Sequence, residues 1–173
     1  MDPTTLATVE DRVAYLIDRE QIRDLIGRYC YGMDSRDWEM YRGVWADEIE
    51  VDLSDVWDKG ADLVKADDWV DATREFFAGM DRSQHIKVPV DWDLRGDEAT
   101  VVSCLQGKHW MPSAFGGSLQ EMVGYYRDGF VRTADGWRMN ALQEILYWNE
   151  GNAHVFDANA KKSFAILVDR YGS

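Results

Sequence analysis

The spacing of apolar residues changes along the chain, from a helical period in the first half to a period of two in the second. Within 22–33, apolar side chains recur three and four positions apart, which predicts an amphipathic helix with one buried stripe. A short lead-in helix is predicted before it over 8–19, and another short helix over 38–45 with Asp37 as its N-cap. Helical spacing returns over 67–79.

The remaining segments alternate apolar and polar residues, as half-buried strands do. The predicted strands are 49–53, 86–92, 99–111, 119–132 and 137–148. A polar loop is expected between 53 and 67, a tight hairpin turn at 133–136, and a tail helix over 157–170.

Helices that precede a run of four long antiparallel strands are typical of an α+β domain. The sequence predicts a curved antiparallel sheet wrapped around the long N-terminal helix, as in a cystatin-like α+β barrel. Such a cone has an interior pocket for a small apolar ligand. Because no linker or repeat divides the chain, residues 1–173 are predicted to form one domain.

Composition narrows the class of partner. The formal charge is −13 and the basic residues are scattered, which argues against a nucleic acid or an anionic membrane as partner. No apolar run is long enough for a membrane span, and no signal peptide is evident. The two cysteines, Cys30 and Cys104, lack metal-ligand spacing, so a reduced, cytoplasmic protein is expected. Eight Trp, eight Tyr and six Phe suit a ring-lined pocket.

Motifs for the common cofactors are missing. No Gly-rich loop joins a strand to a helix, and no G-x-S-x-G elbow occurs. None of the three histidines (His85, His109, His154) has a second ligand at close spacing. We therefore expect neither a cofactor nor a metal.

The segment YCYGMDSRDW at 29–38 carries a family resemblance, together with the strand IEVDL, a His after the third helix and DGWRM in the last hairpin. In this order they resemble the SnoaL-like branch of the nuclear-transport-factor-2-like superfamily. That branch includes scytalone dehydratase, hexachlorocyclohexane dehydrochlorinase and a bile-acid 7α-dehydratase. The resemblance extends over most of the chain.

The resemblance implies a catalytic pair, with Asp34 at the end of the long helix and His85 at the start of the next long strand. His85 would abstract a proton from substrate, while Asp34 orients the ring and stabilises the imidazolium. Elementary chemistry agrees, because a neutral imidazole is a usable base near pH 7 and a carboxylate on its other nitrogen fixes the tautomer. Tyr29 matches a tyrosine of the bile-acid enzyme and would donate a hydrogen bond to a departing or enolising oxygen.

Each of these residues also has a structural interpretation. Asp34 could help to cap the helix at 38–45, and Tyr29 could be an ordinary core ring. His85 could lie at the surface, because alternation places it opposite the apolar residues of 86–90. If that apolar set faces the pocket, His85 needs a bend at the strand start to join it.

The expected substrate-binding shell differs from that of the known members. Tyr125 and Arg127 share one strand face and stand where the scytalone enzyme has small polar residues, which favours a phenolic, carboxylate or otherwise oxygenated substrate. Both could instead point outward. An anionic ligand would depend on Arg127, given the acidic balance of the chain.

Four further residues are predicted to line the pocket. Met111 stands in place of a second pocket His, and His109, two residues away, could serve instead. Leu53 replaces a tyrosine on the first strand, and Trp110 lies on a strand that could line the cone. The chain is therefore expected to be neither scytalone dehydratase nor the dehydrochlorinase.

The favoured function is a cofactor-independent lyase that eliminates water, halide or a small carbon fragment such as formaldehyde from a small aromatic or polycyclic substrate. An isomerase or polyketide-type cyclase with the same base is the close variant. A second class is a non-catalytic binding module or the small subunit of a ring-hydroxylating dioxygenase. The resemblance also implies a homo-oligomer, with a trimer favoured.

Overall fold

The computed structural model describes residues 6–57 and 61–171, and its helices and strands follow the predicted order. The helices are α1 (Val9–Ser35), α2 (Trp38–Gly43), α3 (Ser54–Trp57), α4 (Ala66–Phe77) and α5 (His154–Tyr171). The strands are β1 (Trp45–Asp52), β2 (Asp62–Lys65), β3 (Arg82–Arg95), β4 (Glu98–Trp110), β5 (Leu119–Thr133) and β6 (Gly136–Gly151). This arrangement confirms the predicted α+β class.

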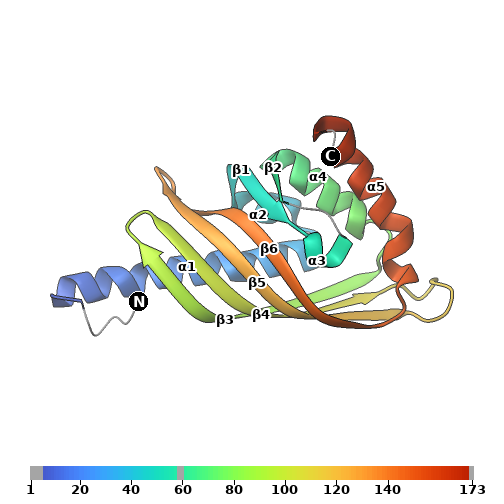
Figure 1. Cartoon of the computed structure of the whole chain (residues 1–173), viewed down its shortest axis with the longest axis horizontal. Coiled ribbons are helices and arrows are strands. Elements are labelled where there is room, and N and C mark those ends of the chain that lie inside the picture. The colour runs from blue at the N-terminus through green and yellow to red at the C-terminus, as the bar shows by residue number, and fades with distance from the viewer. Residues whose placement is uncertain (1–5, 58–60, 172–173) are drawn as a thin grey trace.

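One curved sheet with strand order β2-β1-β6-β5-β4-β3 wraps around α1 (Figure 1). The four long strands are antiparallel, as predicted, while β1 runs parallel to β6 and antiparallel to β2. The short elements α3 and β2 lie within 53–67, where only a loop was predicted. A strand of four residues, Asp62–Lys65, is too short for alternation to distinguish it from a loop.

Helix α1 is one continuous helix, so the prediction of a separate lead-in helix over 8–19 is wrong. The helix begins at a capping box formed by Thr8 and Asp11, and no glycine or proline interrupts it before Gly27. It ends where Arg36 takes a left-handed conformation with φ 62°. Its buried stripe packs inside the sheet, while the N-terminal turns extend beyond the sheet (Figure 1).

The aromatic surplus is concentrated where α1, α2, β1 and α4 meet. Tyr29 lies at the centre, with ring centroids 5.4 Å from Tyr41, 5.7 Å from Trp45 and 6.1 Å from Tyr126. Most of these rings meet edge to face, the arrangement that the ring quadrupole favours. The cluster fixes the middle of α1 against the sheet.

A β-bulge in β3 determines which side chains of that strand point inward. The register with β4 shifts between Pro89 and Asp91, so side chains before and after the shift alternate in opposite phase. Before it, His85 and Lys87 face the interior, and the apolar residues between and after them are on the outer face. The apolar set of 86–90 thus points away from the pocket, and His85 joins the pocket without a bend.

An ion pair between a residue of β3 and a residue of β5 is buried in the interior. Lys87 Nζ lies 2.6 Å from Asp128 Oδ2, and both side chains are fully inaccessible to solvent. The ammonium also lies 3.9 Å from the ring centroid of Tyr126 and 4.4 Å from that of Tyr29. Within the described residues, neither charged group has a further hydrogen-bond partner. Each charge therefore depends on the other and on the ring faces.

Breaking this pair should be costly. Asp128→Asn leaves an uncompensated ammonium in the interior, so we expect a loss of about 3–5 kcal/mol in the free energy of unfolding, measured by urea denaturation. The double variant Lys87→Met/Asp128→Leu should recover most of the loss. A change below about 1 kcal/mol in Asp128→Asn would contradict the assignment of a buried, mutually dependent pair.

Candidate active site

A cavity opens between the inner face of the sheet and the helices α1, α4 and α5, with an empty volume of about 720 Å³ that includes its mouth. Most of its lining is apolar or aromatic. Polar groups come from His85, His109, Tyr29, Tyr126 and Glu144, with Tyr41, Thr73 and Ser163. Phe156, Phe164 and Leu167 of α5 cover one side. A mostly apolar cavity with a few polar groups suits a small organic ligand.

Asp34 and His85 are in direct contact at this cavity. His85 Nδ1 lies 2.7 Å from Asp34 Oδ1, and the His85 backbone N–H donates to Asp34 Oδ2 at 2.6 Å. The Ser83 hydroxyl donates to Asp34 Oδ1 at 2.8 Å. Burial raises the pKa of Asp34, but the hydrogen bonds and charge of His85 and the Ser83 hydroxyl outweigh it and lower the pKa overall. Asp34 is therefore an ionised carboxylate that accepts from His85 Nδ1–H.

The end of α1 is joined to β3 by Arg36. Its guanidinium donates to the Met33 carbonyl at 2.6 Å and to the Ser83 hydroxyl at 2.8 Å. Asp34 does not cap α2, because Asp37 takes that position and accepts from the Met40 backbone N–H at 3.0 Å. The Asp34 carboxylate is thus left for β3.

A second histidine continues the chain of polar contacts. His109 Nε2 lies 3.2 Å from His85 Nε2, and His109 Nδ1 lies 3.0 Å from Gln120 Oε1. The Gln120 amide is oriented by its nitrogen, which donates to the Glu121 carbonyl at 3.2 Å. Its oxygen therefore faces His109 and requires a proton on His109 Nδ1. Burial, followed by the charge of His85, lowers the pKa of His109 to about 3, so this ring is neutral near pH 7.

The proton on His109 Nδ1 determines which contacts His85 can make. Neutral His109 presents a lone pair at Nε2, so its contact with His85 Nε2 is a hydrogen bond only while His85 carries a proton there. With His85 neutral, two lone pairs face each other at 3.2 Å, which is unfavourable. A neutral His85 is then better served by a donor from a ligand. The geometry suits a base that receives a proton from the cavity and shares it with His109.

The structure separates the predicted site residues into two groups. His85, His109, Tyr29 and Leu53 line the cavity, and Asp34 contacts His85. The other four predicted positions, Tyr125, Arg127, Trp110 and Met111, are not among the lining residues.

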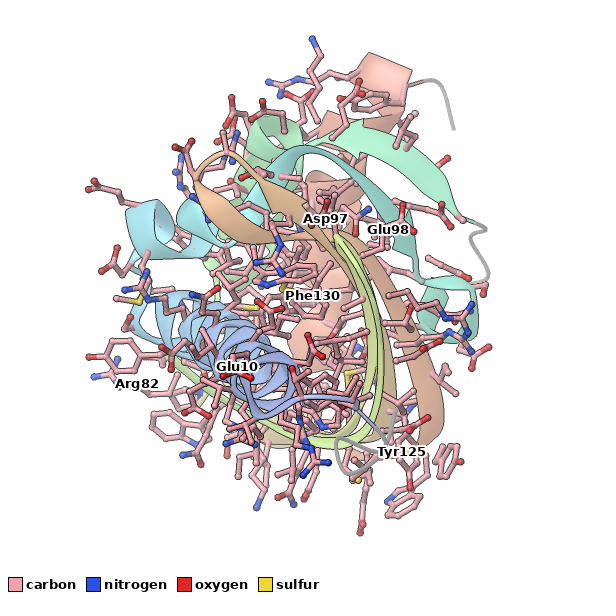
Figure 2. All side chains as sticks on the ribbon, turned by 90° about the vertical axis from the view of Figure 1, so that its left-hand side faces the viewer. Glu10, Arg82, Asp97, Glu98, Tyr125 and Phe130 are labelled. Carbon is pink, nitrogen blue, oxygen red and sulfur yellow. The ribbon has the colours of Figure 1, made fainter. Side chains whose placement is uncertain are left out.

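Strand alternation explains three of the four positions outside the cavity. Tyr125 and Arg127 are on the outer face of β5, and Figure 2 places Tyr125 outside the curved sheet and Phe130 inside it. The prediction that Tyr125 and Arg127 line the pocket is therefore wrong. Trp110 is 43% exposed, and Met111 packs against the core beyond the end of β4.

Several cavity residues were not predicted from the sequence. Tyr126 is adjacent to the predicted Tyr125 but on the opposite face of β5, and Glu144 is its register partner on β6. Gln120 is also on the inner face of β5, where it holds His109. Placing His109 inside puts its register partner Gln120, and with it every second residue up to Tyr126, on the same face. The pairing of His109 with Gln120 was therefore the signal that could have placed Tyr126 in the cavity.

The cavity and its Asp–His pair define a small α+β cone protein with an interior cavity. Residues 14–143 match the family model of the SnoaL-like domain. The chain belongs to this family and has the nuclear-transport-factor-2-like fold, as its resemblance predicted. A comparison with curated proteins finds no match.

Solved structures agree on the fold. The Kfla4162 protein from Kribbella flavida is 28% identical, with a TM-score of 0.77 over 82% of this chain and 97% of that one. A scytalone dehydratase-like protein from Novosphingobium aromaticivorans is 17% identical, with a TM-score of 0.69 over 80% and 89%. Hexachlorocyclohexane dehydrochlorinase LinA-type3 from Novosphingobium barchaimii is 16% identical, with a TM-score of 0.66 over 82% and 94%.

Across 6–57 and 61–171, no three His, Cys, Asp or Glu side chains are grouped as metal ligands. No helix in the same ranges is long and apolar enough to cross a membrane.

The low pKa of His109 should appear in the pH dependence of stability. The unfolded chain protonates this histidine below pH 6.5, whereas the folded chain does so only near pH 3. Because the unfolded state binds more protons in this window, His109 should make stability fall as pH drops, by at most about 1.4 kcal/mol per pH unit. Urea denaturation at several pH values should show a smaller decline in His109→Phe. Parallel pH profiles for the two proteins would contradict the assignment.

Proposed function

We propose that the protein is a cofactor-independent lyase in which His85 is the general base and Asp34 its orienting partner. The observation that supports this most directly is the 2.7 Å contact between His85 Nδ1 and an ionised Asp34 at the wall of a ring-lined cavity. A carboxylate on Nδ1 holds the proton there and leaves Nε2 to act on substrate. The SnoaL-like family and its structural relatives named as a dehydratase-like protein and a dehydrochlorinase are consistent with a small-molecule enzyme of lyase or isomerase type.

The proposed elimination moves one proton through His85. Nε2 takes a proton from a substrate carbon, the C–H electron pair becomes the new double bond, and the leaving group departs from the neighbouring carbon with its bonding pair. If hydroxide leaves, the imidazolium returns the proton and water is released. If formaldehyde leaves, His85 instead removes a hydroxyl proton, the carbon–carbon bond breaks, and the proton is returned to the carbanion.

Tyr29 is proposed to assist as a hydrogen-bond donor. Its ring is buried in the core cluster and also lines the cavity. Burial raises the pKa of its phenol well above the ordinary value, so the hydroxyl remains protonated at neutral pH. A neutral phenol can stabilise a departing or enolising oxygen by donation, without releasing its own proton.

An isomerase or a polyketide-type cyclase would use the same base and remains the close variant. A non-catalytic binding module, or the small subunit of a ring-hydroxylating dioxygenase, is the alternative from another class. A scaffold has no need for a buried imidazole with its own orienting carboxylate, so the contact of Asp34 with His85 favours an enzyme.

Turnover of a substrate tests the lyase function and the role of His85. Purified protein is screened against aromatic alcohols, and the variants are compared on any substrate found. We expect His85→Ala to lower kcat at least 100-fold, because positioned acid–base catalysis contributes about 10²–10⁴. Asp34→Asn should also lower kcat strongly, because an amide does not stabilise the imidazolium.

Arg127→Ala is the matched control, since Arg127 is on the outer face of β5, and it should retain the wild-type rate. Unchanged turnover in His85→Ala would exclude the lyase mechanism. Constant association with a much larger oxygenase subunit would favour the alternative class.

The outer face of the sheet supports the proposed homotrimer. Ile86, Val88 and Val90 are 45%, 53% and 54% exposed on the edge strand β3, with Trp110, Leu119 and Trp148 also exposed. An apolar surface of this kind is typical of an interface. Sedimentation equilibrium should therefore give three times the mass of 19.9 kDa.

The variant Val88→Glu places a charge on that surface and should shift the mass toward the monomer. A wild-type protein that sediments as a monomer at micromolar concentration would rule out the trimer.

A further inference from the structure

A second group of polar side chains lies in the cavity, away from His85. Tyr126 on β5 and Glu144 on β6 are register partners, and both line the cavity. Their residues are only 5% and 8% exposed, so they face the interior and not the surrounding water. Tyr29 lies beside Tyr126 and connects this group to α1.

The two polar groups lie apart along the sheet. His85 pairs across the sheet with Gly107 on β4, and Gly107 pairs with Met122 on β5, so these three residues form one row. Tyr126 is four residues further along β5. At about 3.3 Å per residue, the rows are separated by about 13 Å along the backbone. The wall between them is apolar at Leu105 of β4, which pairs with Gly124, midway between Met122 and Tyr126. A ligand with one or two aromatic rings would fill that interval.

Glu144 has no ion-pair partner among the described residues. Lys87 is paired at 2.6 Å with Asp128, and no lysine or arginine is among the cavity-lining side chains of the described chain. Burial therefore raises the pKa of Glu144 to about 7, although hydrogen bonding from Tyr126 and the charge of Lys87 oppose the rise. Near neutral pH, a large share of Glu144 is a neutral carboxyl with one donor and an acceptor.

We propose that Tyr126 and Glu144 form an oxygen-binding end of the cavity, which holds a hydroxyl or phenol group of an uncharged aromatic substrate while its reacting carbon lies at His85. This inference deepens the proposed lyase function and takes the location of the base from it. The Tyr126 hydroxyl already donates to Glu144 and orients its carboxyl, so a substrate phenol can donate to the other Glu144 oxygen and accept the proton of the neutral carboxyl. A substrate carboxylate would be desolvated there without a cation. The site thus selects neutral hydroxylated aromatics over aromatic acids.

Ligand binding tests the selectivity without requiring turnover. The probes are 2-naphthol, naphthalene and 2-naphthoate, measured by calorimetry or by quenching of tryptophan fluorescence on the full chain. Wild-type protein should bind 2-naphthol at least about tenfold more tightly than naphthalene or 2-naphthoate, the effect of one or two hydrogen bonds. Equal affinities, or a preference for 2-naphthoate, would overturn the proposal.

Variants locate the binding end. Tyr126→Phe and Glu144→Leu should each weaken 2-naphthol binding about tenfold while leaving naphthalene binding unchanged. Glu144→Gln, which keeps a donor and an acceptor, should retain 2-naphthol affinity to within about threefold. Tyr125→Phe is the matched control, because it removes a hydroxyl from the adjacent residue on the outer face, and it should bind as the wild type does.

His85→Ala separates this proposal from the lyase function. It should abolish turnover of a found substrate and keep the preference for 2-naphthol. If His85→Ala loses that preference and Glu144→Leu retains it, the hydroxyl binds at the histidine and the proposed oxygen-binding end is wrong. If the binding preferences hold but His85→Ala turns substrate over normally, the lyase function fails and the binding end stands. Glu144→Gln and Tyr126→Phe keep the test valid if Glu144→Leu does not fold.

Discussion

The ionisation of Asp34 at the edge of an apolar interior is the constraint on which the site depends. Burial alone would neutralise this carboxyl, and three donors from Ser83 and His85 keep it charged. These donors come from β3, while the carboxylate comes from the last turn of α1. The helix must therefore end where the strand begins, and Arg36 secures that junction by contacting both. The same contacts that fix the fold at this corner also fix the tautomer of His85.

The bulge in β3 lets one strand turn His85 and Lys87 inward in its first half and Trp92 inward in its second. The first half must turn His85 and Lys87 inward, which leaves its apolar residues outside, whereas the second half must turn Trp92 into the core. A regular strand cannot present both odd and even positions to the same side. The register shift between Pro89 and Asp91 solves this, and Pro89 suits an irregular position because it has no N–H to donate. The exposed apolar half-strand is thus a consequence of placing a histidine and a lysine inside.

Much of the fold could be predicted from the sequence, because long periodic segments specify their own secondary structure. The four long strands, the hairpin turn and the Asp37 cap carry strong local signals. The site was only partly predictable. Spacing and resemblance indicated Asp34 and His85, but the face of β5 depended on long-range pairing, and a shift of one residue exchanged Tyr126 for Tyr125. Glu144 gave no local signal, because a glutamate on a strand is usually solvent-exposed.

The Asp34–His85 pair and the Tyr126–Glu144 pair differ in how their charges are balanced, so the two ends of the cavity are chemically different. At one end, a carboxylate is held ionised beside an imidazole that can take a proton. At the other, Lys87 is already neutralised by Asp128, so the remaining carboxyl of Glu144 titrates near neutrality. Environments that push two carboxyl groups apart in pKa commonly separate their roles. A proton acceptor and a neutral hydrogen-bonding group therefore face one apolar space, which is the arrangement that the proposed substrate, an uncharged hydroxylated ring held at one end and deprotonated at the other, would use.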